Sequence, residues 1–248
     1  MSGADDVRAE LLSPAELDAR IAENPLAYLP LGTLEFHGPH LPIGLDALNA
    51  HAVCIEAAAL GGGVVLPPVY QGFGGGHGQY PWTVMMNDGV GIESHLRATL
   101  ARLGDFGITT AVVFSGHFAP EQLDLIDALQ QSWNAEGRAL RVIATSVDRC
   151  PSSPLPPDHA GEFETTLLAG SAPDLIHLDL LPSIDAHPAD DPDGDPYGLH
   201  RHERAHALWG VFGPDPRRSD LSSGRALLRH FGRWLADVAR GDLPVTTP

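Results

Sequence analysis

Positive charge is scarce in this chain. Only 15 residues are Lys or Arg, against 32 Asp and Glu, so the formal net charge at pH 7 is −17. A phosphate backbone or an anionic membrane surface would be repelled by most of such a protein surface. The composition therefore predicts neither a nucleic-acid partner nor a membrane partner.

Cysteine and long apolar runs are also rare. The two cysteines, Cys54 and Cys150, stand outside any C-x-x-C pattern, so a disulfide framework is not indicated. No segment approaches the ~18 consecutive apolar residues that cross a bilayer, and residues 1–10 lack the apolar core of a signal peptide. We therefore expect a cytoplasmic protein in a reducing compartment.

The chain does have enough apolar sequence for a sizeable core, since 43% of its 248 residues are hydrophobic. Its 27 glycines and 22 prolines indicate many tight loops between short elements. This length suits one α/β domain, and we expect residues 1–248 to form a single one.

Hydrophobic periodicity predicts strands that alternate with helices. The predicted buried strands are 27–31, 64–66, 109–115 and 140–146. The predicted helices are 13–23, 45–60, 93–103, 120–133, 162–169 and 222–238. The glycine-rich stretch 71–82 and the Asp/Pro-rich stretch 182–196 are expected to be irregular. This alternation favours a parallel sheet with helices on both faces.

A polar cluster follows the first predicted strand. Glu35 and His37 are two residues apart, so in an extended segment both side chains would leave the same face. Asp46 follows after glycines and prolines that can fold the chain back. A mixture of carboxylate and imidazole suits Zn²⁺ or Mn²⁺. An isolated E-x-H also occurs on solvated strand faces, so the metal hypothesis depends on the whole cluster.

His117 follows the predicted strand 109–115. Ligands of open parallel sheets collect at the carboxyl ends of the strands, which favours a role in a binding site. Gly116 permits close backbone approach just before it. A histidine that only satisfies a loop carbonyl would explain the same position.

A third polar group contains His159, Glu162 and Glu164. The two glutamates are two residues apart on a predicted helix, so they point to different faces and at most one enters a site. Acidic residues early in a helix also complement its dipole, which is a sufficient explanation for Glu162.

Three segments resemble signatures of the creatininase (creatinine amidohydrolase) family. Residues 32–42 read GTLEFHGPHLP, similar to the family's G-S-x-E-q-H-G-P-H-L-P, and Asp46 follows shortly. Residues 115–117 (SGH) are similar to N-G-H, and residues 159–166 are similar to H-x-G-x-x-E-T-S. The matches occur in the family's order and, with a weaker one near residue 210, span nearly the whole chain.

The resemblance implies a three-layer α/β/α sandwich with a mostly parallel central sheet, usually assembled into homohexamers. It implies two divalent metal ions held by Glu35, His37, Asp46 and His117, with Asp46 bridging. Zn²⁺ is the first choice, and Mn²⁺ or Fe²⁺ are alternatives. The family hydrolyses C–N bonds of small amides, and one branch instead trims a modified peptide.

The chain departs from creatininase proper at one metal position. There, a Glu two residues after the N-G-H histidine binds metal, whereas this chain has Ala119. We predict that Glu164 supplies the replacement ligand, with Glu121 as second choice.

The substrate loop of the family resembles H-x-x-F-P-G-T and reads HGQYPWT at residues 77–83. The resemblance suggests that the substrate contacts come from His77, Tyr80, Trp82 and Phe118. Trp82 stands where the family has Gly, which argues against creatinine itself as the substrate.

These features predict a metal-dependent amidohydrolase that uses a metal-activated water on a small amide, lactam, ureide or formamide. His159 is predicted to be the general acid for the leaving nitrogen, and Glu164 to bind metal or shuttle a proton. Two alternatives stay open: a peptidase or other hydrolase on the same paired-metal site, and an inactive binding protein that kept the fold.

Overall fold

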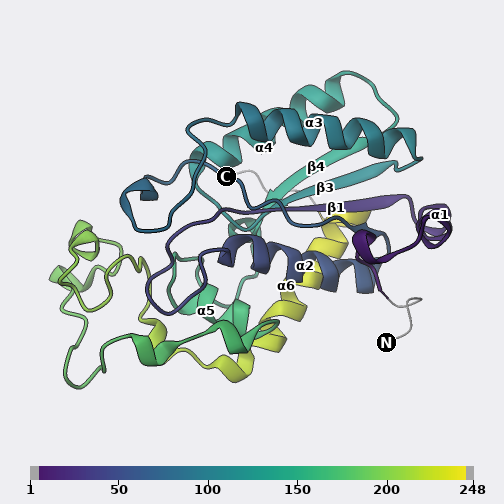
Figure 1. Cartoon of the computed structure of the whole chain (residues 1–248). Coiled ribbons are helices and arrows are strands. Elements are labelled where there is room, and N and C mark those ends of the chain that lie inside the picture. Colours follow the sequence, from purple (N-terminus) through teal and green to yellow (C-terminus); the bar gives the residue numbers. More distant parts are fainter. Residues whose placement is uncertain (1–5, 244–248) are drawn as a thin grey trace.

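A four-stranded parallel sheet forms the centre of the computed structural model, which describes residues 6–243 (Figure 1). The strands are β1 (Leu26–Leu31), β2 (Val64–Val65), β3 (Thr110–Ser115) and β4 (Arg141–Ser146), in the order β2-β1-β3-β4. All neighbouring strands pair in parallel. The inner strands are buried almost throughout, as expected for a sheet covered on both faces.

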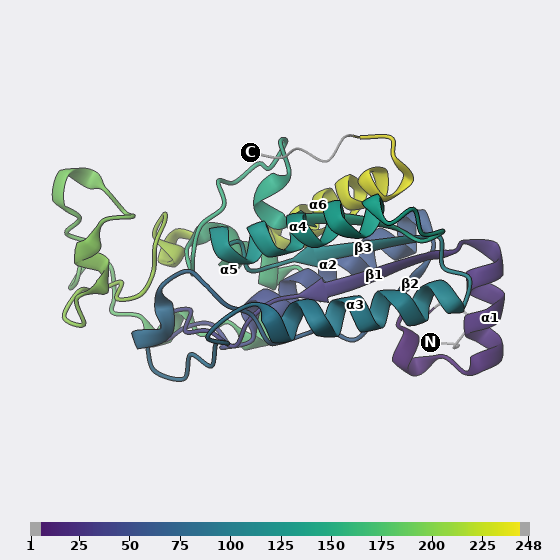
Figure 2. The ribbon, with the colours of Figure 1, turned by 90° about the horizontal axis from the view of Figure 1, so that it is seen from above.

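Helices cover both faces of this sheet. One layer contains α3 (Val90–Asp105) and α4 (Pro120–Ala135), which lie over the strands in Figure 2. The opposite layer contains α2 (Leu45–Gly61), α5 (Glu162–Ala169) and α6 (Gly224–Arg240) (Figure 1). The short α1 (Pro14–Glu23) begins with the predicted capping box of Ser13 and Glu16. The predicted three-layer α/β/α sandwich is confirmed.

Alternation along the strands divides the hydrophobic core in two. Tyr28, Val112 and Phe114 pack with α2, α5 and α6, whereas Leu29 and Val113 pack with α3 and α4. Successive side chains of a strand point to opposite faces of the sheet, so each inner strand contributes side chains to both halves of the core. Within residues 6–243, no helix is both long and apolar enough to cross a membrane.

The segment that carries Glu35 and His37 is not the extended strand that the spacing argument assumed. Strand β1 ends at Leu31, and residues 32–44 form an irregular segment that folds back on itself. The backbone N–H of Glu35 donates to the carbonyl of Ile43 at 2.7 Å, which closes this fold-back just before α2. Loop geometry, rather than strand alternation, therefore orients the two side chains.

Two glycines let the first turn of α2 pack directly on the ends of the inner strands. A Cβ at Gly32 would overlap the backbone of Ala47, and a Cβ at Gly116 would overlap the carbonyl group of Asp46. Because neither glycine has a side chain, α2 begins against the carboxyl ends of β1 and β3. Asp46 is thereby carried to the same edge of the sheet as the loops that follow both strands.

Gly116→Ala is expected to destabilise the protein by about 1–3 kcal/mol, because the added methyl must push the start of α2 away from β3. Gly104→Ala is the matched control, since a Cβ there would meet Leu140 at an ordinary 3.7 Å. The control should stay within about 0.5 kcal/mol of the parent. Urea denaturation followed by circular dichroism measures both. Equal stability of the two variants would contradict the close packing at Gly116.

Candidate metal centre

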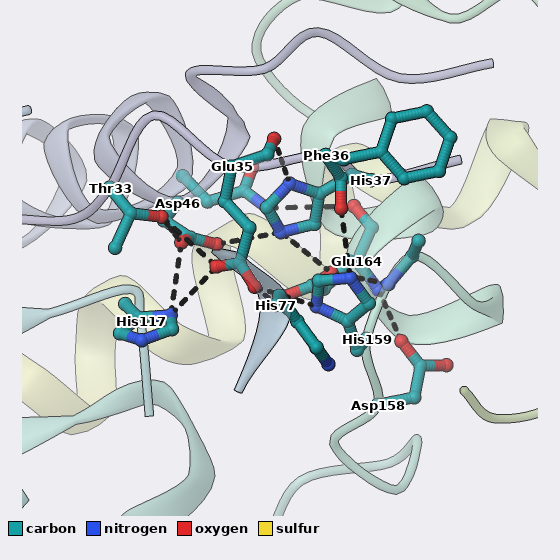
Figure 3. A network of polar contacts seen from close by, with 12 residues as sticks. Thr33, Glu35, Phe36, His37, Asp46, His77, His117, Asp158, His159 and Glu164 are labelled. Carbon is teal, nitrogen blue, oxygen red and sulfur yellow. Dashed lines mark hydrogen bonds and ion pairs between the residues drawn. The ribbon is translucent and has the colours of Figure 1, made fainter. Parts of the chain in front are cut away.

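Four predicted ligands meet at the carboxyl end of the sheet. Glu35 and His37 come from the fold-back after β1, Asp46 from the first turn of α2, and His117 from the loop after β3 (Figure 3). All four side chains are buried. Segments that are distant along the chain thus bring two carboxylates and two imidazoles together.

Asp46 lies between the two histidines. Its Oδ1 is 3.0 Å from His37 Nε2, and its Oδ2 is 3.3 Å from His117 Nδ1. Glu35 faces the same His117 nitrogen, with Oε2 at 3.0 Å. The Thr33 hydroxyl donates to Asp46 and contacts Glu35 Oε2 at 3.1 Å. Thr33 was not among the predicted site residues, although its hydroxyl occupies the Ser position of the first signature.

The third predicted group joins the same cluster. Glu164 Oε2 is 3.6 Å from His37 Nε2 and accepts a hydrogen bond from the Ala160 N–H at 2.6 Å. His159 Nε2 lies 3.0 Å from the Phe36 carbonyl, so this nitrogen carries the hydrogen. His159 Nδ1 is then the atom that faces the carboxylates, 3.9 Å from Glu35 Oε1.

Asp158 is a second residue that sequence reasoning missed. Its carboxylate accepts hydrogen bonds from the backbone N–H groups of Gly161, Phe163 and Glu164, and so caps the start of α5. Burial raises the pKa of Asp158 to about 7 despite these bonds. Asp158 lies four residues before the first residue of α5 and ahead of the N-cap Gly161, so the usual N-cap pattern in the sequence does not find it. By fixing this helix start, Asp158 also fixes the direction of the Glu164 side chain.

Burial and charge together shift the protonation of these groups strongly. Burial lowers the pKa of His37, but Asp46 and Glu164 outweigh it and raise the pKa to about 10. Burial likewise opposes protonation of His117, and Asp46 and Glu35 raise its pKa to about 10. Burial raises the pKa of Glu164 well above its usual range. Without a cation, the cluster therefore holds protons that compensate its carboxylates.

The donor atoms of the cluster fit a divalent metal. His37 Nδ1 is 2.9 Å from the Glu35 carbonyl, which places its hydrogen there and leaves Nε2 directed at Asp46 and Glu164. Among the described residues, this buried Nε2 has no partner in hydrogen-bonding geometry. A histidine whose second nitrogen donates to a backbone carbonyl is the usual arrangement of a metal ligand. Glu35, His37 and Asp46 each offer a ligand atom within 4.8 Å of the others.

A cavity of about 170 Å³ opens onto this cluster. Its lining includes Glu35, Asp46, His117, His159 and Glu164, together with Gly75, His77, Phe118 and Ala119. A larger groove of about 510 Å³ between β1 and α3 is mostly apolar, with His95 as its one ionisable lining residue. The smaller cavity is therefore the one that the candidate metal ligands line.

The four predicted substrate contacts separate into two pairs. His77 and Phe118 line the 170 Å³ cavity, whereas Tyr80 and Trp82 are not part of its lining. Tyr80 is buried, stacks on Phe36 and contacts His202 Nδ1 through its hydroxyl at 2.6 Å. The Trp82 side chain is 79% exposed and so does not narrow the cavity.

The two candidates for the ligand absent at Ala119 are placed differently. Glu164 lies with His37 and His159 in a group whose ligand atoms are within 4.8 Å of one another. Glu121 instead accepts a hydrogen bond from the Gly75 N–H at 3.2 Å and belongs to none of the metal-ligand groups found among the described residues. The geometry favours Glu164 over Glu121.

Another group of metal-ligand type lies apart from this cavity, at Asp191, His200 and His206. The Arg201 guanidinium donates to both oxygens of Asp191, at 2.5 and 2.7 Å. Because Arg201 already neutralises that carboxylate, we assign no metal there.

Comparison of the sequence with known proteins identifies relatives of this chain. Residues 10–239 match the creatininase family, described as creatinine amidohydrolase. Creatinine amidohydrolase of Pseudomonas putida is 29% identical over 267 aligned positions, which cover 93% of this chain and 95% of that protein. Mycofactocin precursor peptide peptidase of Mycolicibacterium smegmatis is 31% identical over 163 positions, which cover 63% of this chain and 62% of that protein.

Solved structures give the same relationship. A creatininase crystal structure superposes with a TM-score of 0.75 at 25% identity, covering 97% of this chain and 99% of that one. A creatininase variant of Zn–Zn type and a Mn creatininase each reach a TM-score of 0.73 at 25% identity, covering 96% of this chain and 99% of theirs. With the matching sequence extending over residues 10–239, the chain belongs to the creatininase family of hydrolases.

Proposed function

We propose that this protein is a metal-dependent amidohydrolase that cleaves a non-peptide C–N bond of a small amide, lactam, ureide or formamide. Two divalent cations would be held by Glu35, His37, Asp46, His117 and Glu164. The observation that carries the proposal is Asp46, whose two oxygens face the nitrogens of two different histidines at 3.0 and 3.3 Å. A carboxylate so placed can bridge a pair of cations.

The donor set suits Zn²⁺ as first choice, with Mn²⁺ or Fe²⁺ as alternatives, because imidazole and carboxylate ligands accept all three. The related creatininases of Zn–Zn and Mn type support this choice. Such cations supply Lewis acidity and lower the pKa of a coordinated water to about 7. The remaining chemistry falls to the side chains around the cavity.

His159 is our candidate for transferring a proton from the attacking water to the leaving nitrogen. Its Nε2–H is held by the Phe36 carbonyl, so Nδ1 is the atom free to exchange a proton on the cavity side. Burial and the neighbouring His37 hold the pKa of His159 well below its usual range, which keeps Nδ1 unprotonated at neutral pH. Nδ1 would take a proton from the attacking water and give it to the leaving nitrogen, since an amide anion leaves poorly.

Glu164 has two roles open to it. Its Oε2 lies close enough to His37 Nε2 to share a cation with it, at 3.6 Å. Burial raises its pKa, so a Glu164 that binds no cation would carry a proton and could serve as its shuttle.

The size of the cavity supports a small substrate. About 170 Å³ is below the ~300–1,000 Å³ typical of sites for drug-sized ligands. His77 and Phe118 would contact the substrate, since both line this space. A single domain over residues 1–248, hexamer formation and a cytoplasmic location stay predictions.

A substrate panel tests the reaction class. The chelator-treated protein is reloaded with Zn²⁺, Mn²⁺ or Fe²⁺ and offered lactams, formamides and ureides, with peptides and phosphoesters in parallel. We expect metal-dependent turnover of a small C–N substrate. Turnover of peptides or phosphoesters alone would favour another hydrolase reaction at this site. A protein that takes up no metal on reloading and turns over no substrate would favour an inactive relative.

Asp46→Ala and His159→Ala should separate metal binding from proton transfer. Asp46→Ala should purify without either cation, because both depend on its carboxylate. His159→Ala should keep the metal and lose about 10²–10⁴-fold in kcat. Asp124→Ala, which removes an exposed carboxylate of α4, is the control and should change neither property. Full activity of His159→Ala would refute its proton-transfer role.

Metal binding should release protons at pH 7.5. His37 and His117 have pKa values raised to about 10 in the metal-free protein, so both are protonated there and must lose a proton to bind a cation. Calorimetric titration of Zn²⁺ in buffers of different ionisation enthalpy should give about two protons released per chain from the two histidines, and a third when Glu164, whose pKa is also raised, binds a cation. The number should fall as the pH rises past 10. Binding with no proton release would contradict this protonation state.

A further inference from the structure

A loop outside the predicted ligand set reaches the centre of the cluster. His77 Nδ1 contacts Glu35 Oε1, on the opposite side of that carboxylate from His117 (Figure 3). Its ring stacks on Phe212, with centroids 5.4 Å apart and planes 17° apart, and the side chain is only 15% exposed. The ring is therefore fixed in place before any substrate arrives.

Three donors converge at this point. Glu35, His77 and His159 each offer a ligand atom within 4.8 Å of the others. This group shares Glu35 with the group formed by Glu35, His37 and Asp46. It extends the centre toward the glycine loop (residues 72–77).

The glycine loop can approach His117 closely because its glycines adopt left-handed backbone conformations and because the side chain of Ala119 is small. Gly74, Gly75 and Gly76 have φ of +90°, +80° and +71°, a left-handed path that favours glycine. A Cβ at Gly75 would lie 3.3 Å from the Ala119 Cβ and 3.4 Å from His117 Cε1. A longer side chain at position 119 would need the space that this backbone occupies.

Side chains of α4 hold the glycine loop in this position. Glu121 accepts a hydrogen bond from the Gly75 N–H at 3.2 Å, and Gln122 Oε1 accepts one from the Phe73 N–H at 3.1 Å. Gln122 Nε2 in turn donates to Ser115 Oγ at 2.9 Å, two residues before His117. The loop and the end of β3 are thereby linked through one side chain.

We propose that His77 Nδ1 is a further metal ligand, bound to the same cation as Glu35, in addition to Glu164, which takes the place of the ligand absent at Ala119. The proposal rests on the paired-metal function above. A neutral imidazole next to a carboxylate is an ordinary ligand pair for Zn²⁺. The other role for His77 is a hydrogen bond that only orients Glu35, and the test separates the two.

The test compares Zn²⁺ binding by the full-length protein and by His77→Ala, His77→Asn and His95→Ala. His95 lies on α3 and is the matched control, because it is an exposed histidine outside the cluster. Asn can still donate a hydrogen bond to Glu35 but offers no imidazole nitrogen. Affinity is measured by competition with a chromophoric chelator, and X-ray absorption counts imidazoles around Zn²⁺. Circular dichroism confirms that each variant is folded.

We expect both His77 variants to bind the more weakly held of the two Zn²⁺ ions about 100-fold less tightly than the parent protein does. This loss equals the upper limit of what removal of a residue that only hydrogen-bonds a metal ligand typically costs. Both should lose one imidazole per pair of ions, and His95→Ala should lose none. Parent-like affinity of His77→Asn, or an unchanged imidazole count in either variant, would overturn the proposal and leave the paired-metal function standing. A parent protein that binds no Zn²⁺ would overturn both.

Discussion

The placement of Asp46 between two buried imidazoles is the interaction on which the rest of this site depends. It requires the first turn of α2 to lie against the ends of β1 and β3, and Gly32 and Gly116 allow that approach because they have no side chains. A one-atom change at either glycine would move the carboxylate away from both histidines. Backbone packing at the sheet edge therefore sets the geometry of the candidate metal centre.

Electrostatics explains why such a centre needs a cation. Three carboxylates, from Glu35, Asp46 and Glu164, are buried within a few ångströms of one another. Burial of charge without compensation is costly, so the metal-free cluster holds protons on His37 and His117 and raises the pKa of Glu164. Divalent cations would replace those protons. The same groups would then serve as ligands in the metal-bound protein and as proton carriers without metal.

The loops around the centre account for the difference between this chain and the pattern of creatininase proper. Ala119 removes a carboxylate, the glycine loop lies against the space next to it, and Glu121 is used to hold that loop. Ser115, in place of the family's Asn, accepts a hydrogen bond from Gln122, whose other amide atom holds the same loop. These departures form one connected set of contacts between α4, the end of β3 and the loop. The sandwich beneath them keeps the family's fold at a TM-score of 0.75.

The sequence by itself determined the order of strands and helices along the chain, and it identified most of the side chains that meet at the sheet edge, although not Thr33 or Asp158. Both are local signals: periodicity defines β3 within a residue of its observed start, and the two signatures, one around Glu35 and one around His117, are each continuous in the chain. Only the tertiary structure decided that Trp82 points to solvent, that His159 exposes Nδ1, and that His77 reaches Glu35. The last two outcomes depend on contacts between residues 42 or more positions apart, namely His77 with Glu35 and His159 with Phe36. No spacing rule within one segment contains that information, because the partner of each atom is chosen by how separate loops pack together.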